Sequence, residues 1–174
     1  MEFTKAVTSD KIDFTTLGAW VCLGSKKITD GKSISFTFDH DYDMYEIFAD
    51  GQAISDSWFD IRPLKQDGSQ FTNILRGVMW TTTTANGFSG DQTGTLCMGS
   101  EVVGYKEFTL RGSSVNSKRD SHRTFTWHSG TSVLSQWIGM SNLQENTPIC
   151  GFKAQAGTTM QNMSLTVFGR DIGS

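Results

Sequence analysis

The stretch Ser33-Ile34-Ser35-Phe36-Thr37-Phe38 alternates polar and apolar residues without a fault. In an extended strand successive side chains point to opposite faces, so Ile34, Phe36 and Phe38 would share one face and the hydroxyl side chains the other. A period of two is typical of a strand that is buried on one side only. The stretch therefore predicts an antiparallel sheet with one face packed on a core.

A second stretch, Met163-Ser164-Leu165-Thr166-Val167-Phe168, follows the same rule. Met163, Leu165 and Val167 would face the core, whereas Phe168 breaks the pattern. Similar short runs predict further strands, at 18–23, 44–49, 57–62, 73–82, 95–103, 105–111, 123–128, 133–139 and 149–154.

Turn-forming residues separate these runs, and they predict tight turns at 29–32, 49–51, 66–68, 86–87 and 129–130. No segment carries a sustained apolar stripe at helical spacing with caps at both ends. Many short strands and few prolines favour an all-β fold, an antiparallel β-sandwich of the jelly-roll type.

The length and composition favour one domain. The chain has 174 residues, 37% hydrophobic and 11% aromatic, which is enough apolar surface for one packed core. Residues 1–16 are polar and weakly patterned, so we expect an N-terminal arm or docking segment followed by a single β-sandwich over 17–174. The stretch 84–94 is expected to be a long loop.

The charge pattern argues against nucleic-acid binding, because the net charge is −3 and the basic residues are dispersed. The densest basic stretch, 118–123, is interrupted by an acid and is interpreted as a solvated loop. No apolar run approaches the roughly 20 residues of a membrane span, and the N-terminus lacks the pattern of a signal peptide. We therefore expect neither a membrane span nor a nucleic-acid partner.

The cysteines and carboxylates suggest neither a cofactor nor catalysis. Cys22, Cys97 and Cys150 lie in separate apolar runs and are expected to be reduced and structural. The run Asp39–Asp43 starts like a calcium loop but lacks the Gly and Glu that an EF-hand needs, so a solvated turn is favoured and a weak calcium site stays open. Asp120-Ser121-His122 has no nucleophile elbow around it, and the strand carboxylates Glu46, Asp60, Glu101 and Glu107 suggest no particular pair.

The aromatic residues leave one binding hypothesis open. Trp20, Trp58 and Trp137 lie within apolar runs and are expected in the core. Trp80, Phe88 and Trp127 lie nearer the loops, where an exposed ring could stack on a sugar or contact a partner. These three residues are the candidate contacts with a glycan or a partner protein.

Two passages together resemble a known group of proteins. One runs from Tyr45-Glu46-Ile47-Phe48 to Asp56-Ser57-Trp58-Phe59-Asp60-Ile61-Arg62, and the other closes the chain with 151–157 and Met163–Arg170. This layout is similar to small jelly-roll structural proteins of tailed bacteriophages. In the last strand Phe168-Gly169 stands where Tyr-Gly would be expected.

The resemblance implies a non-enzymatic virion structural protein, assembled in the host cytoplasm and forming a homo-oligomer, often a trimer. A tail appendage or fibre module, with a role in assembly or host attachment, is preferred over a capsid decoration protein. Its partners would be other virion proteins and, for attachment, a host surface glycan. A free-standing carbohydrate-binding module remains the alternative from a different class.

Overall fold

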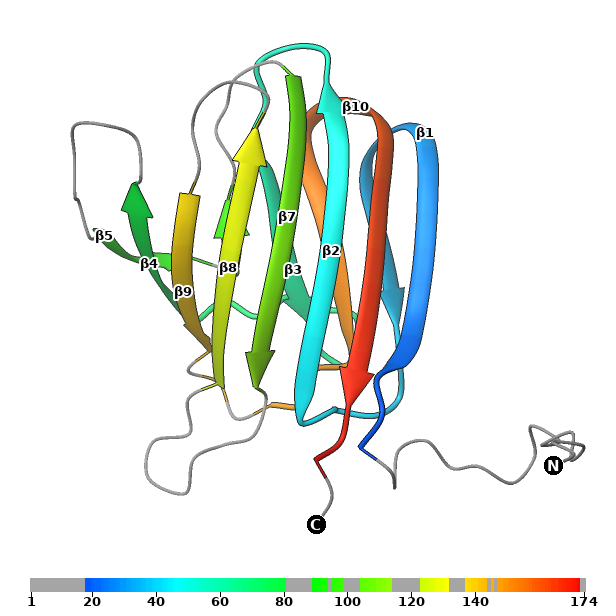
Figure 1. Cartoon of the computed structure of the whole chain (residues 1–174), viewed down its shortest axis with the longest axis vertical. Coiled ribbons are helices and arrows are strands. Elements are labelled where there is room, and N and C mark those ends of the chain that lie inside the picture. Colours follow the sequence, from blue (N-terminus) through cyan, green and yellow to red (C-terminus); the bar gives the residue numbers. More distant parts are fainter. Residues whose placement is uncertain are drawn as a thin grey trace, which may run out of the picture.

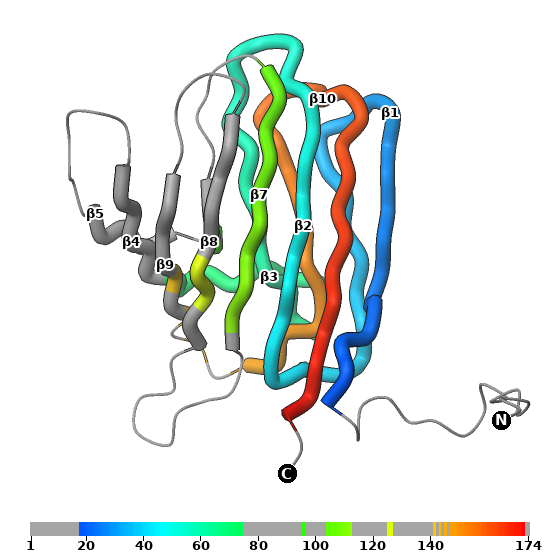
Figure 2. The backbone as a smooth tube through the Cα atoms, viewed as in Figure 1, coloured from blue at the N-terminus to red at the C-terminus, as the bar shows by residue number. Residues whose placement is uncertain are grey.

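A computed structural model describes residues 18–80, 89–93, 95–98, 104–113, 123–131, 137–143, 145 and 147–172. Figure 1 draws the remaining residues as a thin grey trace, and Figure 2 follows the backbone through the Cα atoms. All regular structure in the described residues is β-strand, so the predicted all-β class is confirmed. No helix in this part of the chain is long and apolar enough to cross a membrane. The proposed arm, residues 1–16, lies outside the described residues.

The described strands pair only antiparallel (Figure 1). Their bounds are β1 Val21–Thr37, β2 Met44–Ala53, β3 Phe59–Leu64, β4 Ile74–Trp80, β5 Ser89–Thr93, β6 Cys97–Met98, β7 Gly104–Ser113, β8 Arg123–Thr131, β9 Trp137–Leu143 and β10 Gly151–Arg170.

The strands form two layers because β10 belongs to both. Its second half, from Met160 to Arg170, pairs with β2, and its first half, from Gly151 to Ala156, pairs with β3. The larger sheet therefore runs in the order β5-β4-β9-β8-β7-β2-β10-β1, and the smaller sheet in the order β1-β10-β3-β6. The result is the predicted β-sandwich.

Strand β1 follows β10 from one layer to the other, and Figure 1 shows both strands passing over the top of the sandwich. The register between them shifts where the pair crosses, between Gly31 and Ser33. Nearby, β10 bulges against β2, where Asn162 adopts a left-handed φ of 51°. Bulges raise local twist and bend a strand, and the one in β10 lies at the crossing between layers.

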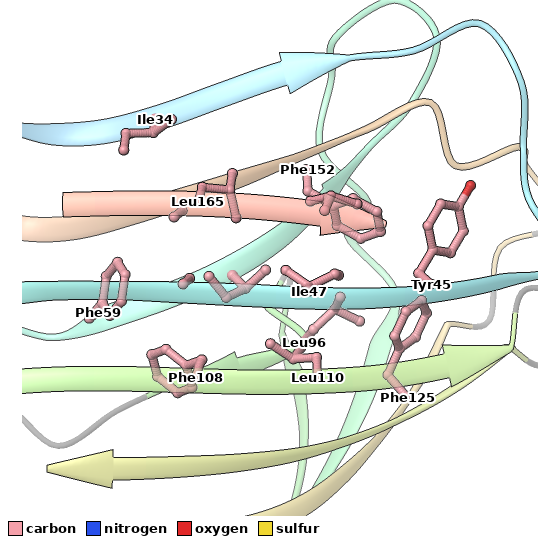
Figure 3. Close-up of a cluster of buried hydrophobic side chains, with 14 of the residues drawn as sticks. Ile34, Tyr45, Ile47, Phe59, Leu96, Phe108, Leu110, Phe125, Phe152 and Leu165 are labelled. Atoms are coloured by element: carbon pink, nitrogen blue, oxygen red, sulfur yellow. The ribbon is translucent and has the colours of Figure 1, made fainter. Parts of the chain in front are cut away.

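The core lies between the layers and is rich in aromatic rings. Tyr45 packs against Phe152 and Phe125, with ring centroids 5.1 and 6.4 Å apart, and Phe59 packs on Phe108 at 5.2 Å. Figure 3 shows these side chains between the strands of the two sheets. The expected core faces are confirmed, because Met163, Leu165, Val167 and Ile34 are buried and Phe36 and Phe38 pack against the core.

Several predicted turns and strand boundaries are wrong. The segments 29–32, 49–51 and 129–130 lie inside β1, β2 and β8. The glycines in them therefore belong to continuous strands and form no turn. Likewise part of 18–23 and most of 33–38 lie in the single strand β1, and most of 149–154 and all of 163–168 lie in β10. The turn at 66–68 is confirmed, with Gly68 at φ 79°. The segment 86–87 lies outside the described residues.

Glu145, which precedes β10, ties down the segment that follows β3. Its Oε1 accepts hydrogen bonds from the amides of Thr72 at 2.8 Å and Asn73 at 3.0 Å, and its Oε2 lies 2.7 Å from Lys65 Nζ. Burial raises the pKa of this carboxyl, but these hydrogen bonds outweigh burial and lower the pKa to about 2.

Candidate functional site

The outer face of the smaller sheet gathers polar and aromatic side chains from two neighbouring strands. We name it the small-sheet face and define it by six residues: Trp58, which directly precedes β3, Asp60 and Arg62 of β3, and Lys153, Gln155 and Gly157 of β10. In the backbone register Asp60 lies opposite Gln155 and Arg62 opposite Lys153. The six positions therefore form one compact patch.

Alternation along each strand explains why these side chains face outward. Phe59 and Ile61 of β3 are fully buried in the core, and so are Phe152 and Ala154 of β10. Because the side-chain period of a strand is two, the residues between them must point away from the core. The expectation that Trp58 belongs to the core was wrong, because its neighbour Phe59 takes the inward position.

The indole of Trp58 lies against Gly157. A Cβ atom at residue 157 would come within 2.6 Å of Trp58 Nε1 and 3.0 Å of Cδ1, so only glycine leaves room for the ring in this position. The tryptophan remains half-buried. An aromatic ring is thereby packed on the same face of the sheet as Asp60 and Arg62.

Buried hydrogen bonds hold the backbone that carries Trp58. The carbonyl of Ser57 accepts a bond from Nζ of Lys106, a buried lysine that reaches from β7. The amide of Thr158 donates to Ser57 Oγ at 2.9 Å, and the amide of Gly157 donates to the Trp58 carbonyl at 3.2 Å. The backbone that carries the ring is therefore held in place before a ligand arrives, which reduces the entropy lost on binding.

Asp60 and Arg62 form an oriented ion pair next to the indole. Arg62 donates from Nη2 to Asp60 Oδ2 at 2.8 Å and from Nε to the same oxygen at 3.1 Å, and its Nη1 donates to Gln70 Oε1 at 2.8 Å. The Asp60 side chain is 2% exposed and that of Arg62 is 25% exposed. Burial raises the pKa of the Asp60 carboxyl, an effect that Arg62, Gln155 and Lys153 oppose.

Lys153 places a second positive charge directly across from Arg62. Like charges at opposite positions of an antiparallel pair are destabilising. On its other side Lys153 faces Ser35 of β1, whose carbonyl accepts a hydrogen bond from Lys26 Nζ at 2.7 Å. Among the described residues of this region, the cations Lys26, Arg62 and Lys153 therefore outnumber the carboxylate of Asp60.

The arrangement is suited to binding a small polar ligand. An aromatic ring offers an apolar surface, and the guanidinium, ammonium and amide groups offer hydrogen bonds in fixed directions. Asp60 already accepts hydrogen bonds from Arg62, so its role on this face is to pair with the Arg62 charge.

A second surface lies on the outer face of the larger sheet. Phe48 of β2 is 40% exposed and meets Phe168 of β10 edge to face, with centroids 6.2 Å apart. Arg111 of β7 pairs with Glu46 at 2.7 Å and lies 5.8 Å from the Trp20 ring. Trp20 is half-buried and was wrongly expected in the core. We name these five residues the large-sheet face.

The structure places two of the three predicted contact residues on the larger sheet. Trp80 ends β4 opposite Trp137 of β9, and Trp127 of β8 lies opposite Leu110 of β7. Their side chains, and the whole of Phe88, lie outside the described part. Neither of these two strand positions belongs to the small-sheet face.

The loop 39–43 is fastened to the start of β2 and to the two residues that follow β10. Asp41 Oδ1 accepts a hydrogen bond from the Tyr45 hydroxyl at 3.0 Å, and Asp43 Oδ2 accepts one from the Ile172 amide at 2.9 Å. His40 Nε2 lies 2.8 Å from Asp171 Oδ2. Within the described ranges no three His, Cys, Asp or Glu side chains converge as metal ligands, so the calcium-like run makes no such group there.

Comparisons with known proteins add little. No protein-family model matches the chain, and no curated protein matches it. Among solved structures, galectin LEC-6 of Caenorhabditis elegans is similar over 80% of this chain and 94% of that chain, with 12% sequence identity and a TM-score of 0.38. A likeness this weak carries no argument, so the function must be argued from the residues.

Alternation within 57–62 could have revealed the outward position of Trp58, because Trp58 and Phe59 cannot share a face. The partner residues Lys153 and Gln155 could not be found in this way, because no local pattern reports which distant strand lies beside β3.

Proposed function

We propose that the protein is a non-enzymatic binding protein that holds a saccharide on the small-sheet face. The observation that carries this proposal is the Trp58 indole, which lies against Gly157 on the same face as the Asp60–Arg62 pair. The C–H face of a sugar ring can stack on an indole while its hydroxyl groups bond to charged and amide side chains.

The resemblance to phage structural proteins suggests where such binding would be used. We propose that the protein is a tail appendage or fibre module of a tailed bacteriophage and that the saccharide belongs to the host surface. A single site of this kind would bind weakly. A homotrimer would raise the avidity by about 10²- to 10⁴-fold without any new contact.

The large-sheet face supports a second role in the same particle, because Phe48 is exposed there and packs edge to face on the half-buried Phe168. Exposed aromatic patches are typical of protein–protein contacts. We propose that other virion proteins dock there, which would leave the small-sheet face open to solvent.

Replacement of the indole tests the saccharide proposal. Trp58→Ala should lower affinity for the saccharides that the native chain selects from a glycan array, by about 2- to 12-fold for the loss of 0.5–1.5 kcal/mol of stacking. The matched control is Trp20→Ala, which removes the same side chain from the large-sheet face. Binding would be measured by titration of backbone amide chemical shifts, with urea unfolding to confirm that both variants fold.

Two results would count against the proposal. One is an array on which the native chain selects no saccharide, and the other is equal loss of binding in Trp58→Ala and Trp20→Ala.

A further inference from the structure

We propose that the small-sheet face selects an acidic saccharide, whose carboxylate binds between Lys153 and Arg62. This inference rests on the proposed saccharide binding and names the chemical class of the ligand.

The first support is an excess of positive charge, because the single carboxylate of Asp60 interacts with both Arg62 and Lys153. Lys153 and Arg62 occupy directly opposed positions on neighbouring strands, where like charges repel. Asp60 bonds to Arg62, and in the described part of the chain no carboxylate lies at ion-pair distance from Lys153. A carboxylate between the two cations would replace repulsion by attraction on both sides.

The second support is the orientation of Arg62. A guanidinium has five N–H donors in a rigid fork. The bonds to Asp60 and Gln70 engage the Nε donor and one donor on each terminal nitrogen. Each terminal nitrogen therefore retains one N–H, and the fork is fixed before a ligand arrives. Charge-assisted bonds from such a fork to a carboxylate are among the strongest hydrogen bonds in proteins.

The neighbours of the two cations favour a sugar acid over an acidic peptide. Ser33 and Ser35 of β1 and Gln155 of β10 offer hydroxyl and amide groups in the adjoining positions. An extended peptide would add at a sheet edge, but at this place β10 lies between β1 and β3. A compact ring with several hydroxyl groups and one carboxylate matches this face better.

The test compares glucuronic acid with its methyl ester and with glucose, by amide shift titration of the folded chain. We expect glucuronate to bind at least about tenfold more tightly than the ester, and the difference to shrink as ionic strength rises. Lys153→Gln should reduce this preference at least about fivefold. Lys27→Gln, the same change on an exposed lysine of β1, should leave it intact.

Arg62 is not replaced, because its loss would leave the buried Asp60 carboxylate without its partner and threaten folding. Lys153→Glu serves instead, since it places a carboxylate in the proposed site and should abolish glucuronate binding. Urea unfolding of each variant checks that the sandwich is intact.

The outcomes separate the two proposals. Equal affinity for glucuronate and its ester, unchanged in Lys153→Gln, would overturn the acidic specificity while saccharide binding stood. Acetate binding as tight as glucuronate would overturn it in favour of a simple anion site. Binding of poly-glutamate without glucuronate would point to an acidic protein surface and overturn both proposals.

Discussion

Gly157 is the residue on which the position of Trp58 depends. Its missing side chain leaves the space that the indole fills, since a Cβ there would overlap Nε1 at 2.6 Å. The Trp58 carbonyl accepts a hydrogen bond from Gly157, and the Ser57 hydroxyl accepts one from Thr158. Because the backbone is held in this way, the ring can avoid an added methyl group only by rotating away from the sheet.

Gly157→Ala should therefore weaken saccharide binding about as much as Trp58→Ala does. We expect the free energy of unfolding to fall by about 1 kcal/mol, at the low end for overpacking because the site is half-exposed. Amide shift titration and urea unfolding would measure the two effects. In the Trp58→Ala background the added methyl group has no ring to displace. The double mutant should therefore bind saccharide as weakly as Trp58→Ala alone. A further loss in the double mutant would show that residue 157 acts independently of the indole.

At the scale of the element, Glu145 links the segment after β3 to the segment before β10. Its folded pKa of about 2 lies below the ordinary 4.5, so the ionised form is favoured in the folded state. The unfolded chain binds the proton more readily, and stability must fall as pH falls. The contribution is fully present above about pH 4.5 and is lost progressively toward pH 2.

Glu145→Gln should remove this dependence. We expect a loss on the order of 1 kcal/mol at neutral pH, since the side chain is partly exposed and its interactions are screened. Urea unfolding between pH 2 and pH 7 should give a flatter profile for the variant than for the native chain. Parallel profiles would show that the carboxylate contributes nothing to acid sensitivity.

The elements themselves were predictable to different degrees. The alternation in 33–38 and 163–168 predicted the inward faces correctly, because burial on one side of a strand appears as alternating apolar and polar residues within that strand. Asp30-Gly31 and Asp50-Gly51 were misread as turns, since glycine follows aspartate in many hairpins. Here these glycines lie beside the ends of two core side chains: a Cβ at Gly31 would meet Cδ1 of Ile28 at 2.5 Å, and one at Gly51 would meet Cε of Met160 at 2.7 Å.

The candidate site was predictable only in part. The outward phase of Trp58, Asp60 and Arg62 is contained in six consecutive residues, once Phe59 and Ile61 are assigned to the core. Their partners on β10 follow from the pairing of β3 with a strand that begins at Gly151, and a single sequence holds no record of that pairing. The predicted contacts at Trp80 and Trp127 drew on nearness to loops, which is a weaker signal than strand phase.

At the scale of the whole molecule, the particle proposal turns on copy number. A tail appendage would be present in a few dozen copies or fewer, because it follows the low symmetry of the tail, whereas a decoration protein follows the capsid lattice and reaches hundreds. We expect the lower number, measured by gel densitometry of purified particles against a protein of known copy number. Hundreds of copies would place the protein on the head, and absence from particles would favour a free carbohydrate-binding module.

The sharing of β10 by both layers has a consequence for biosynthesis. The hydroxyls of Ser25 and Thr166 lie 2.8 Å apart although 141 residues separate them, so β1 emerges from the ribosome long before its partner. Neither sheet can be completed until β10, the most C-terminal strand among the described residues, has left the ribosome. Pairing over such sequence distances slows folding and leaves strand edges exposed meanwhile. The nascent chain must therefore avoid aggregation while β1 is unpaired, and chaperone demand should be greatest between the synthesis of β1 and the release of β10.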